Sequence, residues 1–336
     1  MASTATIDDV SRLARVSPAT VSRVLTGSAP VAAATRRRVL AAVEALGYRP
    51  NAFARALVTN RSGGIGVTVN EVSSPYFGAV IAGLERVTRR EGLHLMVSSG
   101  EADVVSERAS IEFLLGRRAD ALVIQAEALG DDALRELVRE GPVPAVVFGR
   151  SVPGAEGACV VLDNVRGGAL ATDYLLERGH RRIGHIAGPL TFPDARDRLT
   201  GYRRALGAAG VSERDGDVVE SDFHEEGGAR AAARLLERAP DLTAIFVAND
   251  QMAAGALRAL REYGREVPAD VSVVGYDDVI LAQYLTPALT TVRQPLVEMG
   301  VAAASLLLSR LDGVTREVVH RFEPELIERR SVARAA

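Results

Sequence analysis

The sequence predicts a small all-α domain at the N-terminal end of the chain, followed by a larger α/β domain with two lobes. Three observations support this division. The first 50 residues contain three short amphipathic helical patterns with start and stop signals. From residue 65 onward, short apolar runs alternate with helical patterns. Residues 1–62 carry nine arginines and three acidic residues, a net +6, whereas the rest of the 336-residue chain carries a net −9.

The first predicted helix follows Thr6, which is placed to cap it. Asp9, three residues later, supplies the carboxylate of a capping box. Apolar residues then recur at helical spacing, so we expect them to share one buried face. They are Ile7, Val10, Leu13 and Ala14.

The second predicted helix begins at Pro18, where the missing N–H of proline costs nothing, and Ser17 is its cap. Gly27 is the stop signal. The apolar face continues along this helix at Val21, Val24 and Leu25. A tight turn therefore separates two short helices, which is typical of a helix-turn-helix unit.

The other face of the second helix carries small or hydroxylic side chains beside one arginine. These residues are Ala19, Thr20, Ser22 and Arg23. Such a helix fits a DNA major groove, where Arg23 can bind a guanine and the hydroxyls can hold phosphates. An ordinary helical hairpin with a solvated arginine is the alternative. The basic charge of this end of the chain favours DNA, because neutralised phosphates supply most of the affinity.

Residues 33–46 predict a third helix, which ends at Gly47. We expect four apolar residues to face the first two helices: Val39, Leu40, Val43 and Leu46. The Arg36–Arg38 run lies at its start and can meet phosphates, although a solvated charged face is equally consistent. Three helices in about 50 residues make a domain that is small but able to fold alone.

A short segment at 52–58 follows, with Asn51 as its cap. So short a helix is unstable alone in water, and we expect it to be disordered until a partner orders it. A polar, glycine-containing linker at 59–64 then marks a domain boundary. The predicted domains are a DNA-binding head at 1–50, a short helix and linker at 51–63, and a two-lobed ligand-binding domain at 64–336.

The α/β region predicts doubly wound parallel sheets, with too many strands for one domain. The first set contains strands 65–69, 94–97, 121–124 and 145–148, with helices 76–91, 104–116 and 131–139. The second contains strands 159–162, 183–186, 218–220, 244–247 and 271–274, with helices 165–178, 195–209, 225–238, 249–263 and 295–311. We expect a ligand cleft between two similar lobes, at the carboxyl ends of the strands.

The sequence shows no signature of catalysis, of cofactor binding or of a membrane span. It has no phosphate-binding glycine loop, no nucleophile elbow and no metal-ligand spacing among its five histidines. Cys159 is the single cysteine, so no internal disulfide can form. We expect the N-terminus not to be a signal peptide, because it leads directly into a capped helix. We therefore expect a cytoplasmic binding protein that is not an enzyme and has no cofactor, metal or membrane partner.

Residues 6–25 read Thr-Ile-x-Asp-Val-x-x-Leu-Ala-x-Val-Ser-x-x-Thr-Val-Ser-Arg-Val-Leu. This pattern resembles the signature of the LacI/GalR (lactose-repressor) family of transcriptional regulators. Later motifs of that family follow in order, so the resemblance covers about the whole chain. They lie at 47–51, 74–77, 247–250, 275–278 and 289–294. Ala32 departs from the family pattern, because a Ser or Asp cap is usual there.

The resemblance implies a homodimer that binds pseudo-palindromic, double-stranded operator DNA. It identifies 52–58 as a hinge helix that orders on DNA and Leu57 as an apolar wedge in the minor groove, although Leu57 packing on Phe53 is an alternative. Pro18 and Ala19 become base-reading positions that lack donors, so they read bases by apolar contact. The residues expected to contact DNA are Thr6, Ser17, Pro18, Ala19, Thr20, Ser22, Arg23, Arg36, Asn51, Arg55, Ala56 and Leu57.

The same resemblance implies an effector domain like the periplasmic sugar-binding proteins. The residues that it places in the effector cleft are Tyr76, Phe77, Arg150, Arg196, Phe223, Asn249, Asp277 and Gln294. Asp163 joins them because it lies between a predicted strand and a predicted helix. Arg196, Asn249 and Asp277 have the donors and acceptors that sugar hydroxyls need, and Phe223 can stack on a sugar or a purine.

We therefore expect a ligand-responsive repressor of carbohydrate-utilisation genes that a sugar effector releases from DNA. A regulator of the same family that a purine or another metabolite activates as corepressor is the alternative. A sugar-transport binding protein and an α/β enzyme are further alternatives, but neither explains the first 58 residues. The C-terminus has no leucine-heptad extension, which favours a dimer over a tetramer.

Overall fold

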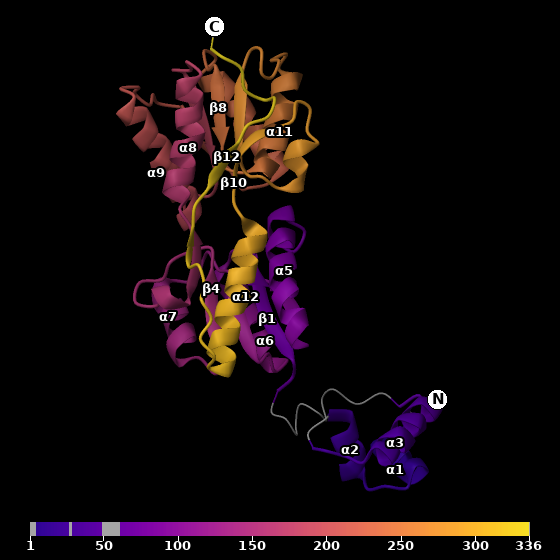
Figure 1. Cartoon of the computed structure of the whole chain (residues 1–336). Helices are drawn as coiled ribbons and strands as arrows, with labels where there is room; N and C mark the ends of the chain where they lie inside the picture. The colour runs from indigo at the N-terminus through magenta and orange to yellow at the C-terminus, as the bar shows by residue number, and fades with distance from the viewer. Residues whose placement is uncertain (1–4, 27–28, 49–60, 336) are drawn as a thin grey trace. The chain divides into compact units, whose positions relative to one another are not determined.

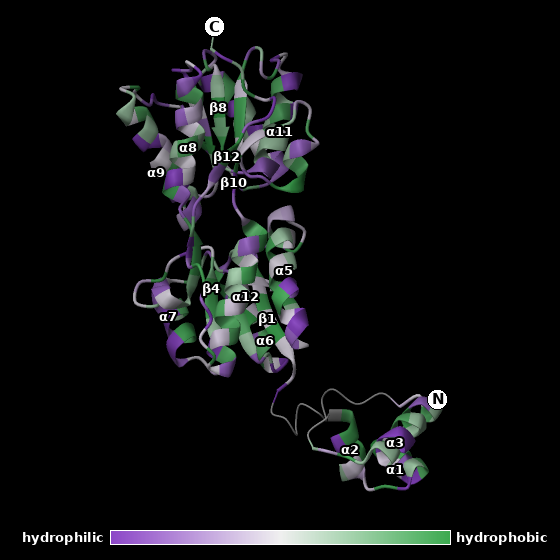
Figure 2. Ribbon diagram, viewed as in Figure 1, coloured by the Kyte–Doolittle hydropathy of each residue, from purple (hydrophilic) through white to green (hydrophobic). Residues whose placement is uncertain are grey.

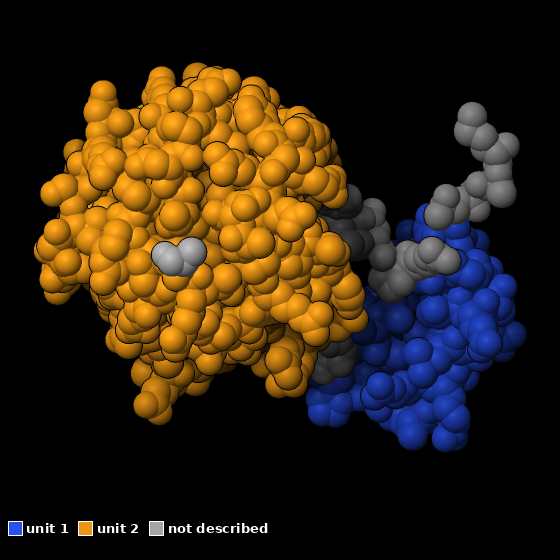
Figure 3. Space-filling view, turned by 90° about the horizontal axis from the view of Figure 1, so that it is seen from above, with its two compact units in different colours: residues 1–63 blue, residues 64–336 orange. Residues whose placement is uncertain are grey.

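A computed structural model of the chain describes residues 5–26, 29–48 and 61–335. The chain divides into two compact units, Met1–Gly63 and Gly64–Ala336, which Figure 3 colours separately. The predicted hinge helix at 52–58 lies outside the described residues. So do Gly27, Asn51, Arg55, Ala56 and Leu57.

The first unit contains the three predicted helices, α1 (Ile7–Ala14), α2 (Pro18–Thr26) and α3 (Ala33–Leu46). The capping box of α1 is confirmed: the Asp9 N–H donates to the Thr6 hydroxyl at 3.3 Å, and the Thr6 N–H donates to the Asp9 carboxylate at 2.9 Å. Ser17 caps α2 by accepting from the Thr20 N–H at 3.2 Å. The side chain of Ala32 gives α3 no such bond.

The core of this unit is narrower than the sequence pattern suggested. Its buried side chains are Val10, Ala14, Val21, Val24, Val39 and Ala42. The prediction that Leu13 and Leu40 face inward is wrong, because these residues are 54% and 46% exposed. Successive residues on a helix point about 100° apart, so the neighbours of Ala14 and Val39 fall outside the stripe that three short helices can bury.

The second unit consists of two lobes, each built on a six-stranded sheet (Figure 1). The strand order of lobe 1 is β11-β5-β4-β3-β1-β2, and that of lobe 2 is β12-β10-β9-β8-β6-β7. All strand pairs are parallel except β10 with β12. Strands with helices on both faces of the sheet are buried on both faces, which explains why β1, β3 and β4 are buried at every residue and why β3 and β4 are continuous apolar runs.

Lobe 1 comprises β1 (Gly64–Val69), α5 (Pro75–Thr88), η1 (Arg89–Glu91), β2 (His94–Ser99), α6 (Val104–Gly116), β3 (Ala121–Ile124), α7 (Asp131–Glu140), β4 (Ala145–Phe148), η2 (Glu156–Ala158), β5 (Cys159–Leu162), α12 (Leu296–Asp312) and β11 (Arg321–Phe322). Lobe 2 comprises α8 (Asn164–Glu177), β6 (Ile183–Ala187), α9 (Pro193–Ala208), β7 (Val218–Glu220), α10 (Glu225–Arg238), β8 (Ala244–Val247), α11 (Asp250–Glu262), β9 (Ser272–Asp277), η3 (Ile280–Gln283), β10 (Thr290–Arg293) and β12 (Glu325–Ile327). Figure 2 shows hydrophobic residues along the strands of both lobes.

Two elements belong to lobe 1, although the sequence predicted them in the second set of strands and helices. Strand β5, expected to open the second set, pairs with β4 through Val147 and Cys159. Helix α12, also expected in the second set, packs beside α5 on the sheet of lobe 1 (Figure 1). Within residues 64–335 the chain crosses between the lobes three times, after β5, β10 and β11. These crossings interleave the lobes, and a linear pattern of strands and helices does not reveal them.

Helices α5 and α12 approach each other closely at two glycines. A methyl group at Gly83 would overlap the Val297 carbonyl oxygen, and one at Gly300 would overlap that of Val80. We expect Gly83→Ala to force the helices apart and to lower the free energy of unfolding by about 1–3 kcal/mol, measured by urea denaturation. Gly78→Ala, at an exposed position of α5 with open space around it, is the control and should be neutral or stabilising. An equal loss in both variants would show that the close contact is unimportant.

No helix in the described part of the chain combines the length and the apolar character that crossing a bilayer requires.

Candidate functional site

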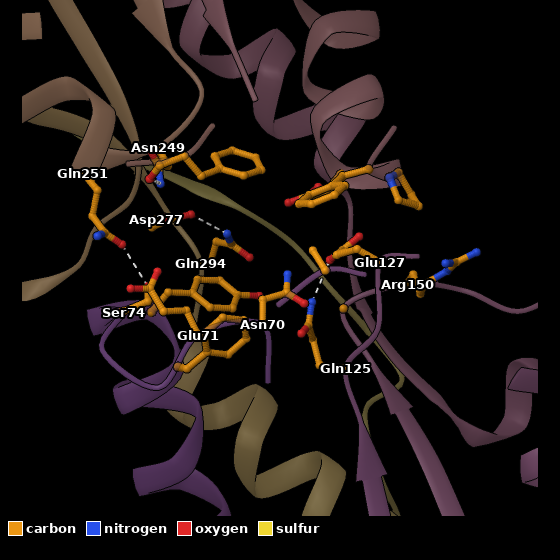
Figure 4. A pocket seen from close by; sticks show the side chains of 18 of the residues that line it. Asn70, Glu71, Ser74, Gln125, Glu127, Arg150, Asn249, Gln251, Asp277 and Gln294 are labelled. Carbon is orange, nitrogen blue, oxygen red and sulfur yellow. Dashed lines mark hydrogen bonds between the residues drawn. The ribbon is translucent and has the colours of Figure 1, made fainter. Parts of the chain in front are cut away.

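A cavity of about 460 Å³ lies between the two lobes of the second unit (Figure 4). Residues from both lobes line it, and many of them directly follow strands. Examples are Asn70 after β1, Gln125 after β3, Gly149 after β4 and Asn249 close after β8. The expectation of a cleft at the carboxyl ends of the strands therefore agrees with the structure.

Most of the residues expected in the cleft line this cavity. They are Tyr76, Phe77, Arg150, Phe223, Asn249, Asp277 and Gln294. Asp163 and Arg196 do not. The Asp163 carboxylate caps α8 by accepting from the Arg166 N–H at 3.0 Å, and it forms an ion pair with Arg321 at 2.7 Å. The exposed Arg196 guanidinium donates to the carbonyl oxygens at 190 and 191.

Arg198 lines the cavity in place of Arg196. Two residues along a helix turn the side chain by about 200°, which explains why one arginine of α9 is exposed and the other is buried. The Arg198 guanidinium donates to Asn164 Oδ1 at 3.0 Å and to the Ala248 carbonyl at 2.6 Å, and it forms an ion pair with Asp194 at 3.1 Å. It also lies over the Tyr276 ring, 4.0 Å from the centroid. Burial acts to lower the pKa of Arg198, but Asp194, Asp277 and two nearby tyrosines act to raise it, and the net shift of the pKa is upward, so the group stays charged.

Asp277 ends β9 and faces Arg198 at 3.8 Å. Its carboxylate also accepts from Gln294 Nε2 at 2.6 Å. The backbone of Asp277 has a φ of 107°, a strained conformation that is typical of functional sites. Burial raises the pKa of this carboxyl to about 7, although Arg198 and Gln294 act to lower it. Asp277 is therefore a rigidly held group that can accept or donate a hydrogen bond near neutral pH.

Asn249 and Phe223 form a second fixed pair in lobe 2. Asn249 caps α11 by accepting from the Met252 N–H at 2.9 Å, and its Nδ2 donates to the Phe223 carbonyl at 2.9 Å. The Phe223 ring lies 6.1 Å from that of Phe192, centroid to centroid. Two aromatic rings therefore border the cavity beside polar groups, a combination that suits a ligand with both polar and apolar faces.

The lobe 1 wall of the cavity is polar. Gln125 Nε2 donates to the Glu127 carboxylate at 2.7 Å, and Arg150 forms an ion pair with Asp131 and donates to the Leu129 carbonyl. Burial raises the pKa of Glu127 to about 8; Asp194 adds to the rise and Arg150 opposes it. Sequence reasoning missed several lining residues: Asn70, Gln125, Glu127, Asp194, Arg198 and Gln251. For Asn70 and Gln125 a usable signal existed, since each is a polar residue directly after a buried strand.

Two side-chain contacts connect the lobes at the cavity. The Ser74 hydroxyl donates to Gln251 Oε1 at 2.8 Å (Figure 4). His224 Nδ1 lies 3.5 Å from the Glu71 carboxylate. Both contacts join lobe 1 to lobe 2, so any change in the angle between the lobes must break or remake them.

In the first unit, α2 presents the expected DNA-binding face. Ser17, Pro18, Ala19 and Arg23 are exposed, and Thr20 and Ser22 are half-buried. The Thr20 hydroxyl lies 3.0 Å from that of Ser17. Thr6 and Arg36 are also exposed. Among the residues that the structure describes, no group of three or more His, Cys, Asp or Glu side chains is arranged to hold a metal ion.

The chain matches two family models. Residues 6–51 match "Bacterial regulatory proteins, lacI family", and residues 172–332 match "Periplasmic binding protein-like domain". Over 330 residues it is 41% identical to the HTH-type transcriptional regulator GalR of Escherichia coli (strain K12), which covers 98% of this chain and 96% of GalR. It is 40% identical to CelR of Thermobifida fusca over 334 residues, covering 97% of this chain and 98% of CelR.

A comparison with solved structures also finds similar regulators. The Lac repressor dimer bound to operator and the anti-inducer ONPF superimposes with a TM-score of 0.87 at 30% identity, covering 98% of this chain and 100% of that chain. The CelR–cellobiose complex superimposes with a TM-score of 0.72 at 37% identity, covering 97% of this chain and 99% of that chain.

Proposed function

Because the chain belongs to the LacI/GalR family of DNA-binding transcriptional regulators, which are not enzymes, we propose that it is a repressor that a sugar releases from operator DNA. The observation that carries this proposal is the cavity between the lobes, joined in one chain to a helix-turn-helix unit. The protein would act in the cytoplasm, where the DNA is.

The chemistry of the cavity supports a sugar as effector. A sugar ring has hydroxyls that donate and accept, and it has apolar C–H faces. Arg198 and Asp277 offer a fixed donor and a fixed acceptor, and Phe223 offers an apolar surface. Asn249 is already engaged on both sides of its amide, so its role is to hold the Phe223 backbone as well as to meet the ligand. The cavity volume lies in the usual range for small-molecule sites, about 300–1,000 Å³.

The position of the cavity also supports a switch. A ligand that binds both walls favours one angle between the lobes over another, and a ligand can shift such an equilibrium only through that difference. The bonds from Ser74 to Gln251 and from His224 to Glu71 are the first contacts that the shift would change.

On the DNA side, we propose a homodimer that binds a pseudo-palindromic operator. The exposed face of α2 enters the major groove, where Arg23 reads a guanine and Pro18 and Ala19 contact apolar base groups. The Lac repressor dimer, which binds its operator in the similar structure, supports the same arrangement here.

The test combines two measurements on the full chain. Fluorescence anisotropy identifies a duplex, from the DNA flanking its gene, that binds more tightly than random DNA at fixed salt. Calorimetry then screens cellobiose, ribose and other sugars beside purine bases. We expect one sugar to bind and to weaken the DNA complex. A purine that binds and strengthens the complex would instead support the corepressor alternative, and a protein with no preferred duplex would contradict the proposal as a whole.

The hinge supplies a further prediction, which depends on the family resemblance because Leu57 lies outside the described residues. We expect Leu57→Ala to weaken operator binding by about tenfold or more, since an apolar anchor at an interface typically contributes over 1 kcal/mol. Sugar binding, measured by calorimetry, should not change. Val105→Ala, which shortens an exposed side chain of α6, is the control and should bind the operator as tightly as the unchanged protein. Unchanged operator affinity in Leu57→Ala would exclude Leu57 from the mechanism.

A further inference from the structure

The cavity is lined by many more acidic than basic side chains. Its acidic residues are Glu71, Glu101, Glu127, Asp194, Asp222 and Asp277. Its basic residues are Arg150, Arg198 and His224. An anionic ligand would therefore enter a region of negative charge unless some cation remained available to it.

The basic side chains are already engaged. Arg198 is shared by Asp194, Asp277, Asn164 and the Ala248 carbonyl. Arg150 is paired with Asp131 and donates to the Leu129 carbonyl; only its buried Nε lacks a partner. That single N–H suits one ligand hydroxyl, whereas the charge of the guanidinium is already balanced. His224 faces Glu71.

The lobe 1 wall presents acceptors. Gln125 Oε1 and Asn70 Oδ1 are buried and lack hydrogen-bond partners among the described residues. The bond from Gln125 Nε2 to Glu127 fixes which end of that amide is the acceptor. Asn70 and Gln125 follow the adjacent strands β1 and β3, and Figure 4 shows both beside Glu127. Buried acceptors without donors are costly, so a ligand that brings donors gains most here.

We infer that the effector is a sugar without an anionic group. The acidic lining and the buried acceptors of Asn70 and Gln125 select for it, and Glu127 strengthens this selection once it is ionised. The inference rests on the proposed sugar effector and specifies its class. Glu127 lines the cavity and accepts a hydrogen bond from Gln125, and its carboxyl interacts electrostatically with Asp194 of lobe 2 and Arg150 of its own lobe. Glu107 also lies near, but it accepts three backbone N–H bonds from residues 127–129.

Two consequences follow for ligand binding. The rise in the pKa of Glu127 to about 8 means that the empty site holds a proton there at neutral pH and loses it above pH 8. Hydroxyl or ammonium donors of a ligand favour the ionised carboxylate, so such a ligand releases protons when it binds near pH 8. An anion favours the protonated form, and it should bind less well as the pH rises.

The test uses calorimetry with neutral sugars (cellobiose, glucose, galactose, ribose), with glucosamine, and with the anions glucuronate, galacturonate and ribose 5-phosphate. At pH 9 we expect every anion to bind at least about tenfold more weakly than its neutral counterpart. At pH 8, the binding enthalpy of the neutral ligand should differ between two buffers of different ionisation enthalpy. This difference measures the protons released on binding. In Glu127→Gln the release should disappear, and the preference against anions should no longer increase from pH 6.5 to 9.

Glu136→Gln, an exposed position of α7 outside the cavity, is the matched control and should behave as the unchanged protein. An anion that binds more tightly than its neutral counterpart would overturn this inference while leaving the sugar effector in place. Unchanged proton release in the Glu127→Gln protein would also overturn the inference. If no sugar of any charge binds, the proposed function itself fails, and the inference fails with it.

Discussion

Replacing Arg198 by alanine should lower the free energy of unfolding by about 3–5 kcal/mol and abolish the response to the effector. The guanidinium is the cation that two carboxylates face, the half-buried Asp194 and the buried Asp277. Its removal leaves these charges in a poorly solvated site. It also takes one of two donors from Asn164 Oδ1, which still accepts from the Tyr276 hydroxyl, and removes the Arg198 donor from the Ala248 carbonyl. Urea denaturation measures the stability, and calorimetry with the identified sugar measures binding. Arg198→Met keeps part of the packing volume. Comparing it with Arg198→Ala therefore separates the effect of the lost charge from the effect of the cavity that alanine leaves.

Arg196→Ala is the matched control, two residues away on the same helix. Its guanidinium is exposed and contacts only backbone carbonyls of the preceding loop, so we expect stability to change by less than about 1 kcal/mol and the effector response to persist. The pair of variants decides between the position that the family resemblance implied and the one that the structure places in the cavity. Loss of response in Arg196→Ala, with a normal Arg198→Ala protein, would restore the first assignment.

Replacing Arg23 by alanine should weaken binding to the specific operator by about 1–3 kcal/mol, or roughly 5- to 150-fold. The reason is that one guanidinium can donate twice to a guanine, and no other described residue on the exposed face of α2 carries such a fork. Binding to random DNA should fall much less, because it depends on the total phosphate contact. Anisotropy with both duplexes at the same salt concentration makes the comparison.

Arg12→Ala provides the control for charge alone. This residue lies on α1, is exposed, and is paired with Asp9 at 3.2 Å. We expect a small loss that is equal for operator and random DNA. If Arg23→Ala also weakened both duplexes equally, Arg23 would be a phosphate contact and the sequence preference would have to come from other residues.

The fold could be predicted well wherever a pattern is local. The bounds of β3, β4, β5, β7 and β8 agree with the sequence-based ranges. For all of them except the partly exposed edge strand β7, the reason is that buried parallel strands are short apolar runs between polar residues. The later strands β10, β11 and β12 were not predicted. Strand β10 contains two threonines and an arginine, and its antiparallel partner β12 comes more than thirty residues later, so neither shows a clear period. The lobe to which β5 and α12 belong depends on the crossings, which leave no local signal.

The candidate site shows the same limit. The family resemblance placed Asn249 and Asp277 in the cleft, and the structure puts both near strand ends, Asn249 two residues after β8 and Asp277 at the end of β9. The choice between Arg196 and Arg198 depends on the rotation of α9 against its sheet, which is a matter of packing. Glu127 could not be found from sequence, because its unusual pKa arises from burial and from Asp194 on the other lobe.

The three crossings between the lobes have a consequence for how the protein is made. Lobe 1 lacks a helix of its outer layer until α12 is synthesised, and lobe 2 lacks an edge strand until β12 follows. A ribosome adds these pieces last, so we expect the body to complete its folding only after translation is nearly finished, whereas the head can fold early. Nascent chains that stop before residue 290 should therefore depend on chaperones, and premature termination there should yield a folded head without a completed regulatory body.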